Sequence, residues 1–255
     1  MNLRALLELC RISNLPTVWS NVALGGAWGV IITNDLARSE GFLVYQDYID
    51  LPTLVVNSFV MMVAGSLIYC GGMVLNDAMD ASIDLAERPS RPIPSGRVSR
   101  KHAFLIAYAM IVGGLGCLHR FIENPWVIFS AITLALLVIS YNLIHQKSAA
   151  GVILMGLCRA ALIVMATTAV SAGEYGLTPI LAIPAAVIFV YTLAISIVAR
   201  HEVPAGRAWV VGFMIVCMPL VDAIMLASIS QWQIVAFCTG CAALTWIGQR
   251  FVAGS

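Results

Sequence analysis

Eight long apolar segments limit what this chain can fold into, because each is about long enough to cross a lipid bilayer. An α-helix rises about 1.5 Å per residue, so roughly 20 mostly apolar residues cross about 30 Å of hydrocarbon. The third segment is the shortest. In chain order the segments cover residues 15–33, 51–75, 103–118, 125–144, 151–172, 177–199, 209–228 and 232–249. This pattern predicts an all-α, polytopic transmembrane helix bundle.

The composition agrees with a membrane protein. Hydrophobic residues make up 60% of the 255 residues and charged residues only 11%, whereas an average soluble domain is roughly 25% charged. The net charge of +1 gives no sign of nucleic-acid binding. No linker rich in Ser, Pro or Gly divides the chain. We therefore expect one transmembrane domain over residues 1–255, with the lipid bilayer as its surroundings.

Lysine and arginine are distributed unevenly between the two sides of the predicted bundle. Cytoplasmic loops retain these residues, whereas translocated loops carry few of them. With the N-terminus inside, only Arg38 and Arg120 lie outside, and Arg159 lies within a span. The inner side then carries Arg4, Arg11, Arg88, Arg91, Arg97, Arg100, Lys101, Lys147, Arg200, Arg207 and Arg250. This predicts an integral membrane protein with a cytoplasmic N-terminus and cytoplasmic active-site loops, in a bacterial inner membrane or an equivalent organelle membrane.

Side chains with oxygen ligands gather at the inner end of the second span. At about 100° per residue on one helix, they can all face one side of the bundle. Carboxylates this close repel one another unless a positive charge lies between them. Oxygen ligands without His or Cys suit Mg²⁺, which takes one or two carboxylates together with waters and phosphate oxygens. The set consists of Asn76, Asp77, Asp80 and Asp84.

Arginines follow these acids in the same inner loop. Guanidinium groups bind phosphate in a bidentate manner, so Arg88 and Arg91 are candidate substrate-binding residues. Pro89, Pro92 and Pro94 end the helix and hold the loop in extended or turn geometry. Acids and arginines together predict a site for a diphosphate. A second interpretation stays open, in which the aspartates of a solvated helix end simply pair with the loop arginines.

This inner motif resembles the first aspartate-rich motif of the UbiA superfamily of intramembrane prenyltransferases. The resemblance rests on Asn76-Asp77-x-x-Asp80-x-x-x-Asp84 and the following ERPSRPIPSGRVS. RISNLPTVWSN (11–21), YNLIHQK (141–147) and MGLCRA (155–160) are similar to further parts of the family. The resemblance implies a bundle of about eight or nine spans around a central cavity that opens toward the lipid. It also implies that Mg²⁺ and an isoprenyl diphosphate bind at the cytosolic rim.

The family's motifs, matched position by position, imply roles for single residues. Asn76, Asp80 and Asp84 would be ligands of the metal and the diphosphate. Asp77 would support them, so the three aspartates are the expected catalytic acids. Lys147 would contact the diphosphate, and the residues expected to bind substrate with it are Arg88, Arg91, Tyr141 and Asn142.

The family's second acidic motif is reduced in this chain. Residues 194–207 stand in its place and read AISIVARHEVPAGR, where Glu202 is the only acidic residue. Glu202 is a candidate catalytic residue. Arg200 is a candidate contact of the diphosphate, where fixed positive charge would replace a second metal. An ordinary positively charged inner loop explains Arg200 equally well.

Two ionisable residues lie inside predicted spans. An ionisable side chain at membrane depth usually faces a cavity or a partner, so we expect Arg159 to line the cavity and bind substrate. Near the end of its span it would instead extend to the membrane surface. Asp222 lies too far from the acidic motif to share its metal. We expect it to pair with a buried backbone or polar group.

Together these features predict Mg²⁺-dependent transfer of an isoprenyl group from an isoprenyl diphosphate, with release of diphosphate. The acceptor is an unidentified aromatic or lipid molecule in the membrane. The reduced second motif motivates an alternative of a different class. In that alternative the chain is a non-catalytic relative that binds or transports an isoprenoid or another amphipathic precursor.

Overall fold

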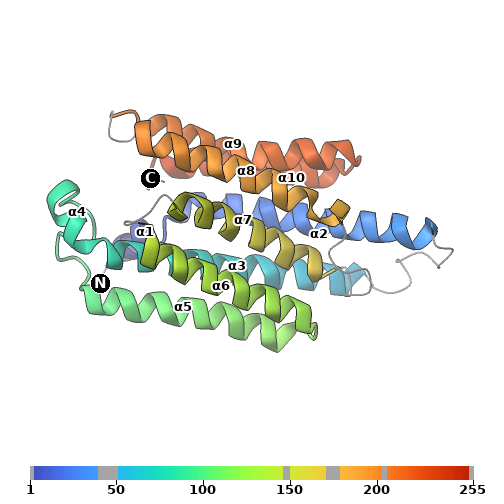
Figure 1. The fold of residues 1–255 in the computed structure, drawn as a ribbon, viewed down its shortest axis with the longest axis horizontal. Coiled ribbons are helices and arrows are strands. Elements are labelled where there is room, and N and C mark those ends of the chain that lie inside the picture. The colour runs from blue at the N-terminus through green and yellow to red at the C-terminus, as the bar shows by residue number, and fades with distance from the viewer. Residues whose placement is uncertain (1–2, 40–50, 146–149, 171–178, 203–205, 253–255) are drawn as a thin grey trace.

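The computed structural model describes residues 3–39, 51–145, 150–170, 179–202 and 206–252. All regular secondary structure in these residues is helical, which confirms the predicted all-α fold. The long helices run side by side along the long axis of the molecule (Figure 1). Three short helical segments accompany them: α1 (Leu3–Leu9), η1 (Ile12–Asn14) and α4 (Ala81–Glu87).

The long helices correspond one to one to the eight predicted spans. By length and composition, six of them in the described residues, α3 and α5 to α9, are suited to cross a membrane. One of these six, α6 (Pro125–Ile144), has the predicted bounds. The other seven long helices of the described residues are α2 (Leu15–Ser39), α3 (Leu51–Met79), α5 (Arg100–Phe121), α7 (Ala150–Thr168), α8 (Pro179–Glu202), α9 (Ala208–Ser228) and α10 (Trp232–Gln249).

Helix α5 is longer than the short third segment predicted from hydropathy. The helix begins at Arg100, because the Ser99 side chain caps it by accepting a hydrogen bond from the backbone N–H of His102. Three polar residues, Arg100 to His102, therefore form its first turn. Hydropathy alone excludes such residues from a span, which is why the predicted segment began three residues too late.

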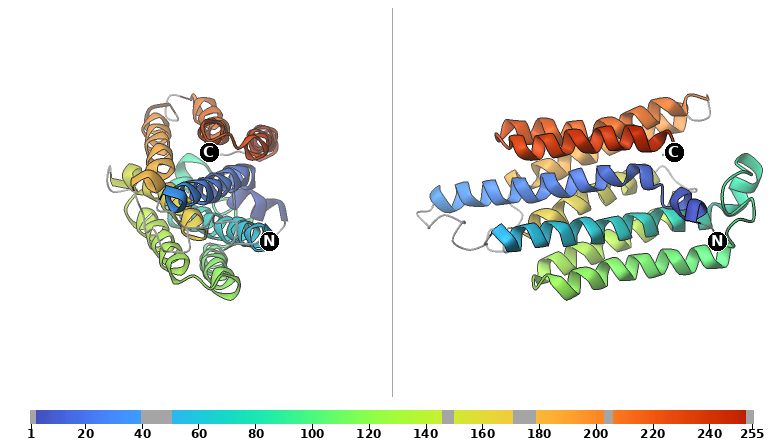
Figure 2. Two further views of the ribbon diagram at one scale, coloured as in Figure 1. Left: turned by 90° about the vertical axis from the view of Figure 1, so that its right-hand side faces the viewer. Right: turned by 180° about the vertical axis from the view of Figure 1, so that it is seen from behind.

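The bundle has two sides with α2 and α7 between them. Helices α3, α5 and α6 form one side, and α8, α9 and α10 form the other (Figures 1 and 2). Glycines bring α3 and α5 together. A Cβ at Gly71 would lie 2.8 Å from the carbonyl oxygen of Ala107, and one at Gly114 would lie 2.9 Å from that of Ala64. Such close backbone contact is typical of membrane helices, which pack through small residues.

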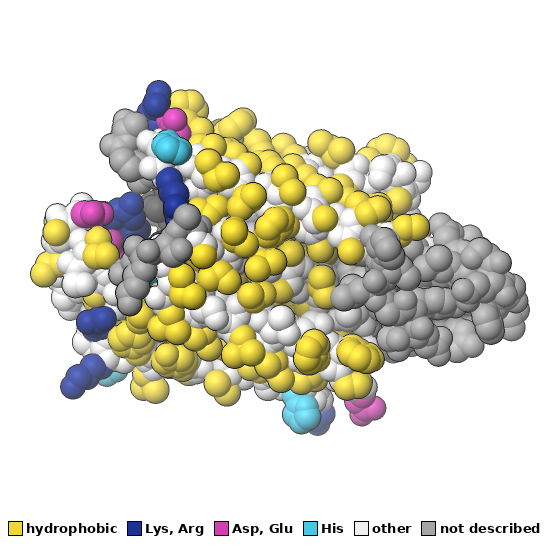
Figure 3. All heavy atoms as spheres, viewed as in Figure 1, with side chains coloured by type: hydrophobic (Ala, Val, Ile, Leu, Met, Phe, Trp, Pro, Cys, Tyr) yellow, Lys and Arg dark blue, Asp and Glu magenta, His cyan; other side chains and the backbone are white. Residues whose placement is uncertain are grey.

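The outer surface of the bundle is apolar along its length, whereas lysines and arginines gather at the end that carries α4 (Figure 3). Many large hydrophobic side chains point outward from the long helices. Among them are Phe59, Leu105, Val112, Phe129, Leu136 and Phe213, each more than half exposed. An outward-facing apolar surface of this kind suits lipid and not water. The chain is an integral membrane protein.

Candidate active site

A cavity of about 450 Å³ lies among α2, α3 and α6 to α9. Its walls include apolar side chains such as Val18, Ile68 and Leu134. Its polar lining is concentrated near the α4 end, where α3, α6 and α8 end, and includes Asn76, Asp80, Arg88, Arg91, His145 and Arg200. An apolar chamber with a polar group at one end is a typical small-molecule site.

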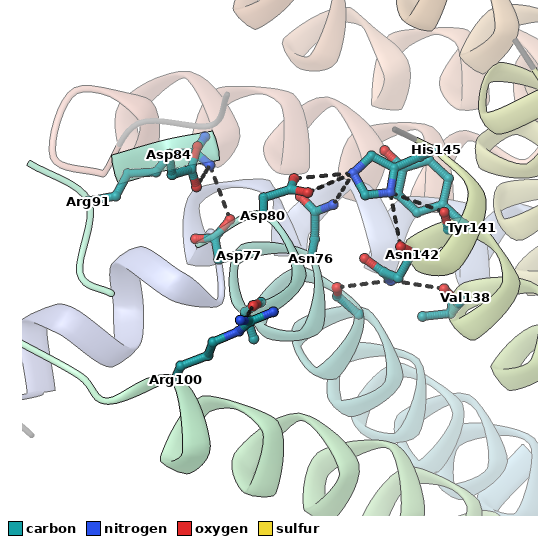
Figure 4. Close-up of polar contacts among 12 residues, drawn as sticks. Asn76, Asp77, Asp80, Asp84, Arg91, Arg100, Val138, Tyr141, Asn142 and His145 are labelled. Atoms are coloured by element: carbon teal, nitrogen blue, oxygen red, sulfur yellow. Dashed lines mark hydrogen bonds and ion pairs between the residues drawn. The ribbon is translucent and has the colours of Figure 1, made fainter. Parts of the chain in front are cut away.

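The acidic motif does not lie on one uninterrupted helix. Helix α3 ends at Met79, and α4 begins at Ala81 after a turn at Asp80. Backbone hydrogen bonds continue through the turn, from Asp80 N to Asn76 O and from Asp84 N to Asp80 O, each 2.9 Å. The change of direction places the acids in two groups that point apart (Figure 4). The single-face arrangement predicted from helical spacing is therefore wrong in this detail.

The first group faces the cavity, and we call it the Asp80 group: Asn76, Asp80 and His145. The Nε2 atom of His145 lies 3.1 and 3.2 Å from the two carboxylate oxygens of Asp80 and 3.2 Å from Nδ2 of Asn76 (Figure 4). On the other side of the ring, Nδ1 lies 3.2 Å from the carbonyl oxygens of Tyr141 and Asn142. The oxygens on both sides of the ring favour the imidazolium, in which both ring nitrogens donate, whereas the amide nitrogen of Asn76 favours a neutral Nε2.

The charge state of His145 follows from the same contacts. Burial lowers the pKa of His145, but the hydrogen bond and negative charge of Asp80 raise it, as do the carbonyl groups of Tyr141 and Asn142. The net effect is a pKa above the ordinary value. The Tyr141 ring stacks on the imidazole with the ring centroids 5.0 Å apart. A raised pKa favours the imidazolium form of His145 beside the Asp80 carboxylate.

The second group, the Arg91 cluster, consists of Arg91, Asp77 and Asp84. Arg91 Nη1 donates to Asp84 Oδ2 at 2.8 Å and lies 3.3 Å from Asp77 Oδ1 (Figure 4). Arg11 Nη2 also lies 3.3 Å from that Asp77 oxygen. Both aspartates are buried, at 4% exposure each. Asp77 and Asp84 therefore pair with arginines, as in the second interpretation that the sequence left open.

The loop that carries Arg91 is held in place by further arginines. Arg97 Nη1 pairs with Oε2 of Glu8 at 2.7 Å, and its Nη2 donates to the backbone oxygen of Ser90 at 2.8 Å. Arg100 Nε donates to the backbone oxygen of Ala78 at 2.8 Å. These contacts tie the loop to α1 and to the end of α3, so the polar end of the cavity has a defined shape.

The oxygen ligands that face the cavity fit a magnesium ion shared with a substrate. Among the described residues, no three His, Cys, Asp or Glu side chains come together as a metal-binding group. Mg²⁺, however, often takes one or two carboxylates and completes its shell with waters and phosphate oxygens. Asp80 and Asn76 line the cavity and can provide such ligands. Asp84 accepts a hydrogen bond from Arg91 and is not part of the lining.

The structure places the other predicted site residues as follows. Asn142 donates to the backbone oxygen of Val138 at 2.8 Å. Glu202 forms an ion pair with Arg207 and does not line the cavity. Lys147 lies outside the described residues. The predicted substrate-binding residues that line the cavity are Arg88, Arg91, Tyr141, Asn142, Arg159 and Arg200.

His145 was not predicted as a site residue. It lies in the segment YNLIHQK, just after the end of α6. Its position at the same end of the bundle as Asp80 was a usable signal, since an imidazole there can balance a carboxylate. Arg11, the second partner of Asp77, was likewise not predicted as a site residue, although it begins the family-like segment 11–21.

Comparison with known proteins agrees with this geometry. The family model described as the UbiA prenyltransferase family matches residues 41–253. The chain belongs to the UbiA prenyltransferase family. A solved structure from work on digeranylgeranylglyceryl phosphate synthase in membranes shares the fold of this UbiA protein. The two chains superpose with a TM-score of 0.53 over 98% of this chain and 95% of that one, at 18% sequence identity.

Similar curated proteins are named digeranylgeranylglyceryl phosphate synthase. The one from Saccharolobus solfataricus is 34% identical over 116 residues, 45% of this chain and 34% of its own length. The one from Methanoregula boonei is 38% identical over 89 residues, 35% and 31% of the two chains. The one from Methanococcoides burtonii is 32% identical over 123 residues, 48% and 39%. The UbiA chain thus spans about a third of the length of these relatives.

Proposed function

We propose that this UbiA-family protein, as one domain over residues 1–255, transfers an isoprenyl group from an isoprenyl diphosphate to an acceptor in the membrane. The observation that carries this proposal is the cavity itself, which joins an apolar chamber to a polar end with Asp80, Asn76 and cationic side chains. An isoprenyl diphosphate has the same division into an apolar tail and an anionic head.

In the proposed reaction, the bond between C1 of the isoprenyl group and the diphosphate oxygen breaks, and the electron pair leaves with the diphosphate. A bound Mg²⁺ would neutralise part of the charge that develops on this leaving group. Arg88 and Arg200 donate hydrogen bonds to its oxygens from the cavity wall. The apolar walls keep water away from the allylic cation. The acceptor then forms the new bond to C1 and loses a proton.

The remaining predicted roles are part of the same proposal. Asn76 and Asp80 hold the ion and the diphosphate. Asp77 and Asp84 act through Arg91, which they hold at the cavity wall. Lys147 is proposed as a further diphosphate contact, whereas Glu202 receives no step because Arg207 pairs with it outside the lining.

We also propose that the end with α4 faces the cytoplasm, of a bacterial inner membrane or an equivalent organelle membrane. The support is the concentration of lysines and arginines at that end (Figure 3). The acceptor class, aromatic or lipid, remains as predicted. The name shared by the relatives, digeranylgeranylglyceryl phosphate synthase, favours a lipid acceptor.

Binding of the donor tests the proposal. Thermal unfolding of the detergent-purified protein is measured with geranylgeranyl diphosphate, with and without Mg²⁺. A ligand at 100 times its Kd adds about 2.7 kcal/mol to the free energy of unfolding. We expect a shift that requires both Mg²⁺ and Asp80, is lost in Asp80→Asn and is kept in Glu87→Gln, an exposed acid on α4. No shift with this or shorter isoprenyl diphosphates would contradict the proposed site.

One observation favours a non-catalytic function as the alternative. In the place of the second acidic motif, Glu202 is engaged by Arg207 and contributes nothing to the cavity lining. A protein that only binds or carries an isoprenoid would keep its ligand intact. Incubation with a radiolabelled isoprenyl diphosphate and membrane lipids distinguishes the two, because only an enzyme releases diphosphate in a manner that depends on Asp80.

A further inference from the structure

A chain of hydrogen-bonded polar side chains, buried except for the partly exposed Arg159, connects α9, α2 and α7 inside the bundle. Asp222 on α9 is fully buried, and its Oδ2 accepts a hydrogen bond from Asn21 Nδ2 at 2.9 Å. The Oδ1 atom of the same Asn21 accepts from Arg159 Nη1 at 3.1 Å. Arg159 Nη2 also donates to Oγ1 of Thr17, at 2.9 Å. One neutral amide therefore links a carboxylate to a guanidinium.

This arrangement accounts for two charges at membrane depth. Arg159 is near the middle of α7, and Asp222 lies within α9, so water at the membrane surface is far from both. Charges buried in this way must be compensated by partners. The amide of Asn21 donates to Asp222 and accepts from Arg159. It therefore orients the guanidinium and connects its positive charge to the negative charge of Asp222.

Arg159 nevertheless faces the cavity. It is among the lining residues, and its Cζ lies 5.5 Å from the centroid of the Tyr69 ring, another lining residue. The two side-chain hydrogen bonds to Asn21 and Thr17 each use one donor, and a guanidinium has five N–H donors. A direct bidentate pair with Asp222 would use up more donors and cancel the charge locally. The intervening amide leaves a cation directed at the cavity.

This cation lies deeper in the bundle than the Asp80 group. Gly151 at the start of α7 is level with His145, since a Cβ there would lie 2.7 Å from His145 Cα. Arg159 follows Gly151 by eight residues, which is about 12 Å along a helix. Tyr69 precedes Asn76 by seven residues, about 10 Å on α3. The cavity thus has two cationic levels about two helical turns apart.

We propose that Arg159 and Tyr69 form a second anion subsite, which binds an acidic group of the acceptor. Asp222 and Asn21 are positioning residues for this subsite. The inference rests on the proposed function, because the donor diphosphate is taken to occupy the Asp80 group. An acceptor with a carboxylate or a phosphate then has its acidic group about 10 Å from the diphosphate, so the two anions do not compete for the same cations.

Matched pairs of charged and neutral acceptors test the subsite. One pair is a hydroxybenzoate and its methyl ester, and the other is a prenylglyceryl phosphate ether and its phosphate-free alcohol. Their Kd values are measured on wild-type protein and on the variants Arg159→Gln and Asp222→Asn. Each measurement is made with and without geranylgeranyl diphosphate and Mg²⁺. Arg250→Gln is the matched control. The Cζ atom of Arg250 lies 4.0 Å from the centroid of the Trp246 ring, and the residue is not part of the cavity lining.

The expected result is a preference of about tenfold or more for the charged member of one pair in the wild-type protein. Which pair shows it identifies the acid as a carboxylate or a phosphate. Arg159→Gln should abolish this preference and leave the Kd of the neutral member and of the donor within about twofold. Asp222→Asn removes a negative charge near Arg159 but keeps an oxygen that can accept from Asn21, so it should keep or increase the preference. If Arg159→Gln does not fold, Asp222→Asn carries the test, because a weaker preference for the charged member in that variant would contradict the subsite.

Other outcomes overturn the inference. A wild-type protein that binds the donor but prefers neither charged acceptor has no such subsite. An Arg159→Gln protein that keeps the preference, or that binds charged and neutral acceptors equally more weakly, would show that Arg159 only stabilises the packing of the helices. A wild-type protein that does not bind the donor would contradict the proposed function. The acceptor preference measured without the donor would still test the subsite on its own.

Discussion

The Nε2 atom of His145 lies 3.1 Å from Oδ1 and 3.2 Å from Oδ2 of Asp80, although 65 residues separate the two in the chain. Both side chains are largely shielded, at 15% and 17% exposure. The contact joins the end of α6 to the turn between α3 and α4. It therefore stabilises the polar end of the cavity and also places an imidazole beside a carboxylate that lines the cavity.

Replacing His145 by alanine should lower the stability of the protein without ligand. The change leaves the Asp80 carboxylate without its imidazole partner, which costs about 1–3 kcal/mol for a buried polar group. Mg²⁺ alone should recover part of this loss in His145→Ala, and less in the wild-type protein, because the ion then replaces the missing cation. Thermal unfolding at a series of Mg²⁺ concentrations measures both effects.

The control is His119→Ala, an exposed histidine in the last turn of α5. It should change neither the stability nor the response to Mg²⁺. Equal behaviour of the two variants would show that the contact between His145 and Asp80 contributes nothing to the site.

Removal of the Arg91 side chain should be more costly. Asp84 is 4% exposed, and in the described residues Arg91 is its ion-pair partner. Breaking a buried ion pair by removing one partner costs about 3–5 kcal/mol, since the other charge stays buried. We expect this loss in Arg91→Met, measured by thermal or chemical unfolding in detergent. Arg91→Met combined with Asp84→Leu should regain most of the stability.

Arg88 provides the comparison for Arg91. It is exposed on the same loop and also lines the cavity. Arg88→Met should leave the free energy of unfolding nearly unchanged and weaken only the binding of the donor. If Arg91→Met behaved in the same way, the Arg91 cluster would not be a structural element of the fold.

The long helices could be predicted from the sequence because hydropathy is a local property. The bounds of α6 were correct, and α5 was predicted too short because both its first and its last turn contain polar residues. The split of the acidic motif could not be predicted in this way. Helical spacing assumes an unbroken helix, whereas the chain turns at Asp80, and Asp77 and Asp84 both contact Arg91.

The sequence also could not predict which distant segments contact one another. Asn21 and Asp222 are 201 residues apart, and Asn21 and Arg159 are 138 apart. The expectation that Asp222 pairs with a buried polar group was confirmed. Its partner could not be named, because no spacing rule connects α2 to α7 and α9. The apolar pattern shows which faces are buried but not which helices face one another.

The glycines of α5 should respond to alanine in opposite directions. A Cβ at Gly114 would lie 2.8 Å from Ile68 Cγ1 and 2.9 Å from the Ala64 carbonyl oxygen, so α3 and α5 must separate. Overpacking of this kind costs about 1–3 kcal/mol. A Cβ at Gly116 meets no atom within 4 Å. Gly116→Ala should therefore stabilise the helix by about 0.5–1 kcal/mol. Thermal unfolding of the two variants, in the same detergent, gives the comparison.

The cavity wall should set the length of the isoprenyl donor. Leu134 on α6 lines the cavity and is 4% exposed. Leu134→Phe adds volume to a chamber of about 450 Å³, so a long isoprenoid tail loses space. We expect the variant to bind geranyl diphosphate as tightly as the wild-type protein and geranylgeranyl diphosphate more weakly. Thermal stabilisation by geranyl, farnesyl and geranylgeranyl diphosphate, each with Mg²⁺, measures this preference.

The matched control for this change is Leu136→Phe. Leu136 lies two residues further along α6, is 59% exposed and is not part of the cavity lining. Two residues on a helix turn by about 200°, so the same added ring points toward lipid. This variant should keep the wild-type preference among the three donors. A uniform loss of binding in Leu134→Phe would instead mean that the ring disturbs the polar end, whereas a selective loss for the longest donor places the isoprenoid tail against α6.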